Sequence, residues 1–321
     1  MPAATAIAHS NIALAKYWGK ADVSDNRTAV PSLSMTLTQL YTRTCVAFDA
    51  SLPADVVLLG GKPAADAFCR RVVRLLDQVR RRADLRQFAR VDTTNSFPTA
   101  AGLASSASGF AALAMAATRS AGLELSKTEL SALARSASAS AARSVFGGYV
   151  ALDAGAESAR PVLDAPAFPL AMLVCVVASA EKAMGSTQGM LHTQRTSPYY
   201  PSWQREAPAV FEAITQALLA KDIEQLGPLV EHSSLMMHAS MWAARPALDY
   251  LLPATLEVIQ TVRGLQRRSV PAYVTMDAGP NVKVLTLPSF RDSVLASVSQ
   301  VAGVERVIAC ETGPDAHWVE T

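Results

Sequence analysis

Four short segments of this 321-residue chain combine residue types that could hold phosphate or move a proton. The first, residues 98–108, reads PTAAGLASSAS. Small residues let a backbone approach a phosphate closely, and a helix beginning behind them would present free N–H groups. The hydroxyls of Ser105 and Ser106 could add ligands for phosphate or Mg²⁺. The segment lacks the GK[ST] ending of a Walker loop, and small residues would equally permit close helix packing, so both interpretations stay open.

The second segment, residues 136–148, reads SASASAARSVFGG. Serines near a helix terminus either cap the helix or hold an anion. Arg143 follows Ser140 by three residues, and its guanidinium could form a forked pair with a carboxylate or phosphate. A capped helix with a surface arginine would have the same sequence, so the segment alone does not establish an anion site.

The third segment, residues 274–281, reads VTMDAGPN. Asp277 falls at the end of a predicted strand and directly before a Gly-Pro turn, where a side chain can project into a cleft. A carboxylate there could accept or orient a hydroxyl proton, as phosphoryl transfer to an alcohol requires. An aspartate that only stabilises the turn is the alternative.

The fourth segment, residues 15–20, reads AKYWGK and places two lysines around Tyr17 and Trp18. Two cations within six residues beside a strand are plausible ligands for a polyphosphate. A solvent-exposed strand end would have a similar composition.

Other catalytic patterns find no support. The histidines have no metal-ligand spacing and are interpreted as structural or surface groups: His9, His192, His232, His238 and His317. No serine stands in a G-x-S-x-G elbow, which argues against a hydrolase triad. The cysteines are far apart and lack CxxC spacing, which predicts buried free thiols in a reducing compartment: Cys45, Cys69, Cys175 and Cys310.

Composition narrows the class of protein. Half of the residues are apolar, 17% are charged, and the net charge is +2, so the chain is globular and has no global field for nucleic acid or an anionic membrane. Arginines between residues 70 and 82 alternate with apolar residues and predict a solvated face of an amphipathic helix. No apolar segment approaches the roughly 18 residues of a membrane span, and the first residues do not resemble a signal peptide. We expect a cytoplasmic protein.

The elements that must position these segments follow from hydrophobic periodicity. Residues 1–60 predict an antiparallel sheet with hairpins, including a turn at Gly60 and Gly61. Further elements are expected as helices at 64–83, 126–142, 203–220, 222–240, 253–268 and 290–302, with strands at 88–95, 149–152, 169–179, 272–277, 282–287 and 304–310. An alanine-rich helix should follow the loop at 98–108. This order indicates α+β layers in each half of the chain, with a boundary near residue 180.

The four segments together, in this order, resemble those of the diphosphomevalonate decarboxylase family within the GHMP small-molecule kinases. The similarity extends to EKAMGSTQGM, RTSPYYPSW, SSLMMHAS and RPALDYLLPATLEVI, and so covers nearly the whole chain. It implies a two-lobed α+β fold, with an N-terminal lobe like domain 2 of ribosomal protein S5 at residues 1–180 and a ferredoxin-like C-terminal lobe at 181–321. It also implies a homodimer that uses ATP and Mg²⁺ to phosphorylate and decarboxylate mevalonate 5-diphosphate to isopentenyl diphosphate.

The resemblance also implies roles for particular residues. Asp277 matches the catalytic aspartate that prepares the C3 hydroxyl, Arg143 the arginine on the substrate carboxylate, and Lys16 a lysine that assists ATP. The implied substrate-binding residues are Tyr17, Trp18, Gly19, Lys20, Arg71, Ser138, Ala139, Ser140, Ala141, Ala142, Arg143, Ser186 and Thr187. Those implied for the ATP phosphates are Pro98, Ala101, Gly102, Leu103, Ala104, Ser105, Ser106 and Ser108, with Ser105 and Ser106 near Mg²⁺.

The sequence departs from the family pattern at two positions, and three alternative functions stay open. Ala137 and Ala139 replace glycines of the family pattern, which could add methyl groups near the substrate. A decarboxylase acting on mevalonate 5-phosphate would need fewer cations than Lys20 and Arg71 supply. A kinase that stops at the 3-phosphate would need Arg143 less. A non-catalytic binder of an isoprenoid intermediate would not need Asp277.

Overall fold

The N-terminal lobe is built on a mixed sheet with helices against one of its faces. A computed structural model describes residues 2–97, 105–177 and 184–320. The sheet has the strand order β14-β1-β4-β7-β5-β6, and β8 pairs with β4 and β9. Its strands are β1 (Ala4–Ala15), β4 (Ser32–Asp49), β5 (Val56–Leu59), β6 (Lys62–Pro63), β7 (Phe88–Asn95), β8 (Tyr149–Leu152), β9 (Arg160–Leu163) and β14 (His317–Val319). Only the β5–β7 pair among these is parallel, so the expectation of an antiparallel sheet with a hairpin at Gly60 and Gly61 largely holds.

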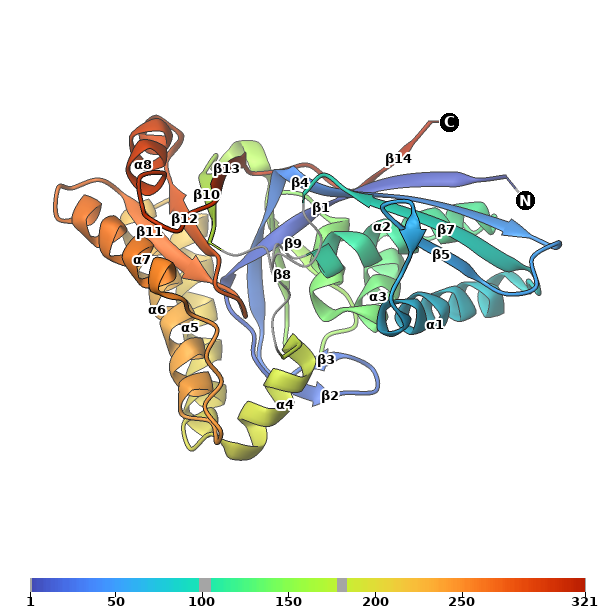
Figure 1. Ribbon diagram of the computed structural model, residues 1–321, viewed down its shortest axis with the longest axis horizontal. Helices are drawn as coiled ribbons and strands as arrows, with labels where there is room; N and C mark the ends of the chain where they lie inside the picture. Colours follow the sequence, from blue (N-terminus) through green and yellow to red (C-terminus); the bar gives the residue numbers. More distant parts are fainter. Residues whose placement is uncertain (1, 98–104, 178–183, 321) are drawn as a thin grey trace.

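Helices α1 (Asp66–Ala83), α2 (Ser105–Ser120) and α3 (Lys127–Ala137) cover this sheet (Figure 1). In α1, buried Val72, Leu75, Leu76 and Val79 recur at helical spacing, which confirms the predicted amphipathic helix. Its arginines do not all face solvent, however: Arg71 and Arg80 are half-buried. Helix α2 is buried on nearly every side, and its alanines let it pack closely between the sheet and its neighbours.

The predicted helix at 126–142 is interrupted. α3 ends at Ala137, Ser138 adopts extended backbone angles, and a 3₁₀ helix, η1 (Ala139–Val145), follows. Serine favours helix ends because its side chain competes for backbone hydrogen bonds. After this break, η1 packs against β1, the strand that directly precedes Lys16.

The C-terminal lobe is an antiparallel sheet with the order β11-β12-β10-β13. Its strands are β10 (Ala171–Val176), β11 (Ala272–Met276), β12 (Val282–Thr286) and β13 (Arg306–Glu311), and its helices are α4 (Ser186–Thr196), α5 (Tyr200–Leu219), α6 (Ile223–Trp242), α7 (Pro253–Gln266) and α8 (Arg291–Val298). Short elements complete the described chain: β2 (Lys20–Asp22), β3 (Arg27–Thr28), η2 (Ala165–Ala167) and η3 (Pro288–Phe290). The sequence patterns predicted neither α4 nor β14.

The two lobes share a hydrophobic core. Apolar residues of β1 and β4, such as Ile12 and Leu33, are in one buried cluster with Met172 of β10 and Phe211 of α5. The last strand, β14, returns to pair with β1, so both chain ends lie at the same end of the molecule (Figure 1). The lobes are therefore joined by packing and by the chain path. The predicted boundary near residue 180 stays a prediction.

Two further expectations can be compared with the structure. The cysteines are free thiols, as predicted, but only Cys175 and Cys310 are buried. Cys45 and Cys69 are half-buried, so the prediction of burial is wrong for these two. No helix in residues 2–97, 105–177 and 184–320 is long and apolar enough to cross a membrane.

Candidate active site

Asp277 lies between two lysines at the junction of the lobes. It follows β11, while Lys16 follows β1 in the other sheet. Lys16 Nζ is 2.6 Å from Asp277 Oδ1 and also donates to the carbonyl of Ala13 at 2.8 Å. Lys283 Nζ, from β12, is 3.2 Å from Asp277 Oδ2 and donates to the Asn281 carbonyl. Each carboxylate oxygen therefore has its own ammonium partner.

This arrangement fixes the charge of the carboxylate. Burial opposes ionisation of Asp277, but the charges and hydrogen bonds of Lys16 and Lys283 outweigh it and hold the pKa of Asp277 far below its usual range. Burial also lowers the pKa of Lys16 to about 8, although Asp277 acts in the opposite direction. Asp277 is therefore an anion at neutral pH, and Lys16 is a cation whose pKa lies close to neutral pH.

Helix α6 fixes both segments that form this pair. The Lys16 backbone N–H donates to Ser233 Oγ at 2.9 Å. The Met276 N–H donates to Ser234 Oγ at 2.9 Å. His238, one turn further along α6, is buried, and neither of its ring nitrogens has a hydrogen-bond partner of normal geometry among the described residues. Burial and the nearby Lys16 charge lower the pKa of His238 to about 4, so it is neutral. Its interpretation as a structural group stays a prediction.

Arg143 is buried in a pocket of hydroxyl and amide groups. Its guanidinium donates to Ser32 Oγ at 2.5 Å, Ser34 Oγ at 3.0 Å and Asn11 Oδ1 at 3.3 Å. Asn11 in turn donates to Ser144 Oγ at 2.8 Å. Burial lowers the pKa of Arg143 to about 10, so the group remains charged near neutral pH. No carboxylate of the described residues forms an ion pair with Arg143. Because Arg143 is only 2% exposed, the interpretation as a surface arginine is wrong.

The residues before Arg143 divide between site and core. Ser138 Oγ and Ser140 Oγ are 3.4 Å apart, and both side chains are half-buried. The neighbouring alanines all belong to the hydrophobic core of the N-terminal lobe: Ala137, Ala139, Ala141 and Ala142. The methyl groups that replace the glycines of the family pattern therefore pack within the protein.

Tyr17 connects Arg143 to a second group of cations. The Arg143 Cζ is 5.8 Å from the centre of the Tyr17 ring, and Lys20 Nζ is 5.7 Å from it. Lys20 Nζ also donates to Asn26 Oδ1 at 3.2 Å. Burial, together with the charges of Arg71 and of a further arginine, lowers the pKa of Lys20 to about 8.

Arg71 is held by the N-terminal lobe. Its guanidinium donates to the Ala137 carbonyl at 2.8 and 3.2 Å and lies 4.4 Å from the Phe110 ring centre. The charge of Arg71 lowers the pKa of Lys20, so the two cations are neighbours. Together they form an electropositive region suited to a phosphate-bearing ligand.

Trp18 and Gly19 are packing residues in the described structure. Trp18 is 1% exposed and accepts a hydrogen bond at its carbonyl from Trp203 Nε1 at 2.8 Å. Gly19 has a φ of +118°, and a Cβ there would lie 1.9 Å from the hydroxyl of Tyr200. The Lys20 backbone is paired with the side chain of Gln194 in α4. This packing directs the backbone between Tyr17 and Lys20.

Ser186 and Thr187 are the first residues of α4. The body of that helix contacts this same segment, because a Cβ on Gly189 would lie 3.2 Å from the Trp18 ring. The structure therefore packs α4 against the segment from Trp18 to Lys20 through Gly189 and Gln194. The predicted role of Ser186 and Thr187 in diphosphate binding stays a prediction.

The described part of the phosphate segment is the start of α2. Ser105 and Ser106 occupy its first turn and are half-buried, and that turn contains no acidic residue. Ser108 is fully buried, with its Oγ 2.7 Å from Thr42 Oγ1 and 3.3 Å from Ser10 Oγ. This geometry favours a packing role for Ser108. The other residues predicted for the ATP phosphates lie outside the described residues: Pro98, Ala101, Gly102, Leu103 and Ala104.

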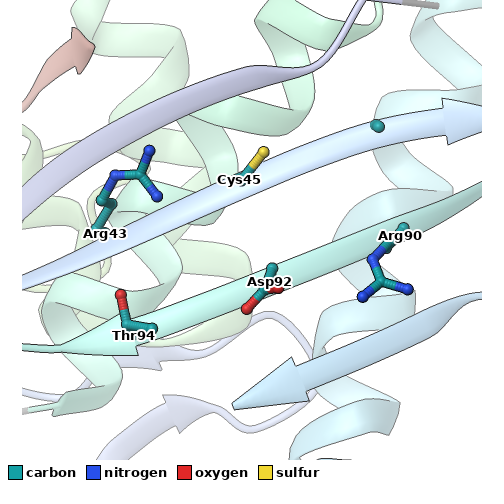
Figure 2. Close-up of a pocket in the computed structure, with 6 residues that line it drawn as sticks. Arg43, Cys45, Arg90, Asp92 and Thr94 are labelled. Carbon is teal, nitrogen blue, oxygen red and sulfur yellow. The ribbon is translucent and has the colours of Figure 1, made fainter. Parts of the chain in front are cut away.

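A separate pocket lies on the face of the N-terminal sheet away from the helices (Figure 2). It has a volume of about 280 Å³ and is lined by Arg43, Cys45, Ala47, Arg90, Asp92 and Thr94. Their positions on β4 and β7 alternate with buried residues that face the helices. The predicted site residues are on other elements, so this pocket is distinct from the Asp277 site. In the described residues there is also no cluster of His, Cys, Asp or Glu suited to a metal ion.

Comparison with known proteins identifies the family of this chain. A model of the diphosphomevalonate decarboxylase-like N-terminal domain matches residues 8–162, and one of the mevalonate 5-diphosphate decarboxylase C-terminal domain matches residues 172–315. The chain belongs to the diphosphomevalonate decarboxylase family. Within this family, the diphosphomevalonate decarboxylase of Candida albicans is 34% identical to it, over 98% of this chain and 97% of that protein.

Solved structures of family members share the fold. Mevalonate diphosphate decarboxylase from Staphylococcus aureus superposes with a TM-score of 0.94 at 34% identity, covering 99% of this chain and 98% of the other. A complex of MDDEF with MVAPP, AMPPCP and magnesium has a TM-score of 0.93 at 38% identity, with 99% of both chains covered. The two-lobed α+β fold expected from the sequence is confirmed.

A relative with a different substrate is also similar in sequence. The phosphomevalonate decarboxylase of Haloferax volcanii is 31% identical over 97% of this chain and 96% of that protein.

Several residues of this site were missed by the sequence reasoning. Asn11, Ser32 and Ser34 hold Arg143, and Ser233, Ser234 and Lys283 hold the Asp277 region. Asn11, Ser233 and Ser234 lie within segments that carry the family resemblance, which was the available signal. Lys283 stands in a buried strand, VKVLT, where a charged residue among apolar neighbours is itself a signal.

Proposed function

We propose that this protein catalyses the ATP-dependent decarboxylation of mevalonate 5-diphosphate to isopentenyl diphosphate, CO₂, ADP and phosphate. The observation that carries the proposal is the convergence of three groups around Tyr17. A lysine-bound carboxylate, a buried arginine that forms no ion pair with a carboxylate of the described residues, and the Lys20 region provide one group for each reacting or anchoring part of such a substrate. The family membership of the chain supports the same activity.

Asp277 orients the C3 hydroxyl and accepts its proton as the oxygen bonds to phosphorus. Its low pKa makes it a weak base. Phosphoryl transfer requires little proton abstraction before the new bond forms, so a fixed anion is sufficient to align the nucleophile. Lys16, within hydrogen-bond distance of Asp277, is the cation available to assist the transferred phosphoryl group.

Arg143 holds the carboxylate through the second half of the reaction. When the C3 phosphate leaves, its oxygen takes the bonding electrons and positive charge develops at C3. The bond from C2 to the carboxyl carbon then breaks, its electrons form the C2–C3 double bond, and CO₂ departs. The fixed guanidinium orients this bond without reorganisation, and Lys20 and Arg71 hold the diphosphate so that C3 stays in place.

The start of α2 fits a nucleotide with Mg²⁺. Two partly exposed hydroxyls, of Ser105 and Ser106, stand at the N-terminus of a 16-residue helix with no acidic residue in its described first turn. Oxygen ligands suit Mg²⁺, and a helix N-terminus suits phosphate. When bound, ATP would supply the phosphoryl group, and Mg²⁺ would offset the negative charge of its phosphates. These two serines are the residues that we propose to hold it.

A decarboxylase for mevalonate 5-phosphate is the second candidate, favoured by the similarity to the Haloferax protein. The presence of two neighbouring cations, Lys20 and Arg71, supports the diphosphate instead. The remaining alternatives are a kinase that releases the 3-phosphate and a non-catalytic binder. Arg143 argues against the kinase, and Asp277 argues against the binder. A homodimer, the lobe boundary near residue 180 and a cytoplasmic location also remain predictions.

One assay separates these functions. The purified protein is given mevalonate 5-diphosphate or 5-phosphate, and ADP and CO₂ are measured together. We expect equal amounts of ADP and CO₂ and a higher kcat/KM for the diphosphate. A higher kcat/KM for the monophosphate would select the second candidate, ADP without CO₂ a kinase, and neither product a binder.

The role of Asp277 is tested in the same assay. Asp277→Asn keeps the shape of the side chain but removes its charge, and we expect kcat to fall by roughly 10³-fold while the diphosphate still binds. Asp292→Asn is the matched control, because Asp292 is 82% exposed on α8. Wild-type turnover by the Asp277 variant would remove this residue from the mechanism.

A further inference from the structure

Lys283 is an unusual residue for its position. It lies in β12, which has β11 on one side and β10 on the other, and its side chain is 1% exposed. Its strand neighbours Val282 and Val284 are fully buried. A charged lysine at such a position is destabilising unless an anion or several acceptors compensate it. The ionic partner of Lys283 within the described residues is Asp277.

One carboxylate therefore compensates two buried lysines. Neutralising Asp277 requires a single cation, and Lys16 already provides it at 2.6 Å. A second buried ammonium on the same carboxylate adds a desolvation cost without being needed for charge balance in this state. The presence of the Lys283 ammonium is explained if Lys16 does not stay paired with Asp277 throughout the reaction.

The two ion pairs differ in how they are anchored. Lys16 belongs to the N-terminal sheet, and its contact with Asp277 spans the lobes. Asp277 directly follows β11 and Lys283 lies in the adjacent β12, so one turn, 277–281, joins them. Lys283 Nζ also donates to the Asn281 carbonyl in this turn at 3.2 Å. The Asn281 side chain accepts from the Val177 N–H at 2.8 Å, which ties that turn to β10. Lys283 therefore stays with Asp277 if the lobes or the Lys16 side chain shift.

We propose that Lys283 is a positioning residue that keeps Asp277 ionised and oriented while Lys16 turns from the carboxylate to the transferred phosphoryl group. This inference rests on the proposed function, since it assigns Lys16 to that group. Lys16 can then exchange one anionic partner for another without leaving the half-buried carboxylate of Asp277 uncompensated. Lys283 itself does not contact the reacting atoms.

The proposal has a consequence for pH dependence. The titratable or charged groups around Asp277 are Lys16 after β1, Tyr17 beside it, Arg143 in η1, His238 in α6 and Lys283 in β12. Cys175 in β10 is on the opposite face of the sheet from Lys283, although the charge of Lys283 acts on its thiol. An opposite charge within contact distance lowers a carboxyl pKa by roughly 1–3 units. Without Lys283, the pKa of Asp277 rises, so the pH below which activity falls must rise as well.

The first experiment compares the wild type with Lys283→Met and Lys283→Arg. Methionine keeps the apolar stem without the charge, and arginine restores the charge. We expect kcat to fall roughly 30-fold in Lys283→Met, with the KM for both substrates within about threefold of wild type, and the acid limb of kcat to move up by about one pH unit or more. Lys283→Arg should return the acid limb to the wild-type position. Lys62→Met, a change of an exposed lysine in β6, is the control.

Two outcomes overturn the proposal. One is a Lys283→Met variant whose kcat and acid limb equal those of the wild type. The other is a loss of kcat with the acid limb unmoved, which would show that Lys283 only supports the fold. The wild-type protein is assayed before any variant. If it produces neither ADP nor CO₂, the proposed function itself is contradicted.

A second measurement does not need turnover. Urea unfolding of Asp277→Asn, Lys283→Met and the double variant gives the coupling between the two residues. We expect the double variant to be more stable than the sum of the single losses predicts, because each single change leaves a buried or half-buried charge with less compensation. Additive losses would overturn the ion pair on which the proposal depends, and this comparison remains valid if Lys283→Met is inactive.

Discussion

Lys16 and Asp277 are 261 positions apart in the chain, yet Lys16 Nζ lies 2.6 Å from Asp277 Oδ1. The pair joins the end of a strand in one sheet to the end of a strand in the other. Its geometry depends on the packing of both lobes against helix α6. The state of this pair therefore controls the reaction proposed for the site.

Activity should fall in alkaline solution as Lys16 loses its proton. Burial places the pKa of Lys16, and also that of Lys20, at about 8 in the free protein. Because the protonated forms are required, kcat/KM should decrease as pH rises through about 8. Bound anions favour the protonated lysines, so the alkaline limb of kcat should lie at higher pH than that of kcat/KM. Rates measured between pH 6 and 10 check this order, and an alkaline limb of kcat/KM near pH 10 would contradict it.

Arg143→Lys should not preserve activity. The guanidinium is held by three oxygen acceptors, from Ser32, Ser34 and Asn11, which a single ammonium cannot satisfy in the same geometry. We expect kcat/KM for mevalonate 5-diphosphate to fall about 100-fold or more, with little change in the KM for ATP. Arg160→Lys, at an exposed position, is the control. Near-wild-type decarboxylation by Arg143→Lys would exclude a forked contact with the carboxylate.

Arg71→Met should reduce the preference for a diphosphate. Loss of one charge-assisted contact of about 1.5–3 kcal/mol should lower the ratio of kcat/KM for the 5-diphosphate to that for the 5-phosphate by roughly tenfold or more. The adjacent Arg70 is exposed on the same helix, so Arg70→Met is a closely matched control. An equal loss with both substrates would indicate that Arg71 supports the site only through its contacts with Phe110 and Ala137.

Gly19→Ala should destabilise the protein. The added Cβ would lie 1.9 Å from the Tyr200 hydroxyl, and the φ of +118° is strained for alanine. We expect a loss of roughly 2–5 kcal/mol in the free energy of unfolding, measured by urea denaturation. Tyr200→Phe removes a buried hydroxyl that has no partner among the described residues, so it should be nearly neutral alone and restore part of the loss in the double variant. Absence of any restoration would show that backbone strain alone is responsible.

Local patterns in the sequence predicted most of the elements. The spacing of Val72, Leu75, Leu76 and Val79 predicted α1, and the β-branched run at 88–95 predicted β7 with its observed bounds. Such elements are predictable because the side-chain periodicity that buries one face is a local property. Helix α4 was missed because its sequence, STQGMLHTQRT, has few apolar residues. It packs instead through Gly189 against Trp18, a contact between distant segments.

The site was predicted in part for the same reason. Asp277, Arg143 and the Lys16–Lys20 segment each stand in a recognisable motif, so the sequence by itself determined which residue types are present and the family resemblance of the chain. The environment of each side chain was not encoded locally. Arg143 could be a surface group until Ser32, Ser34 and Asn11 were found around it.

The sequence, through its motifs and its family resemblance, determined a two-lobed α+β fold, the candidate base Asp277 and the candidate anion-binding residues. Only the tertiary structure decided that Lys16 and Lys283 bind opposite oxygens of Asp277, and that Tyr17 contacts both Arg143 and Lys20. The physical reason is that charge compensation and burial depend on distances across the lobes. Those distances are set by the packing of both sheets and α6, which no single segment contains.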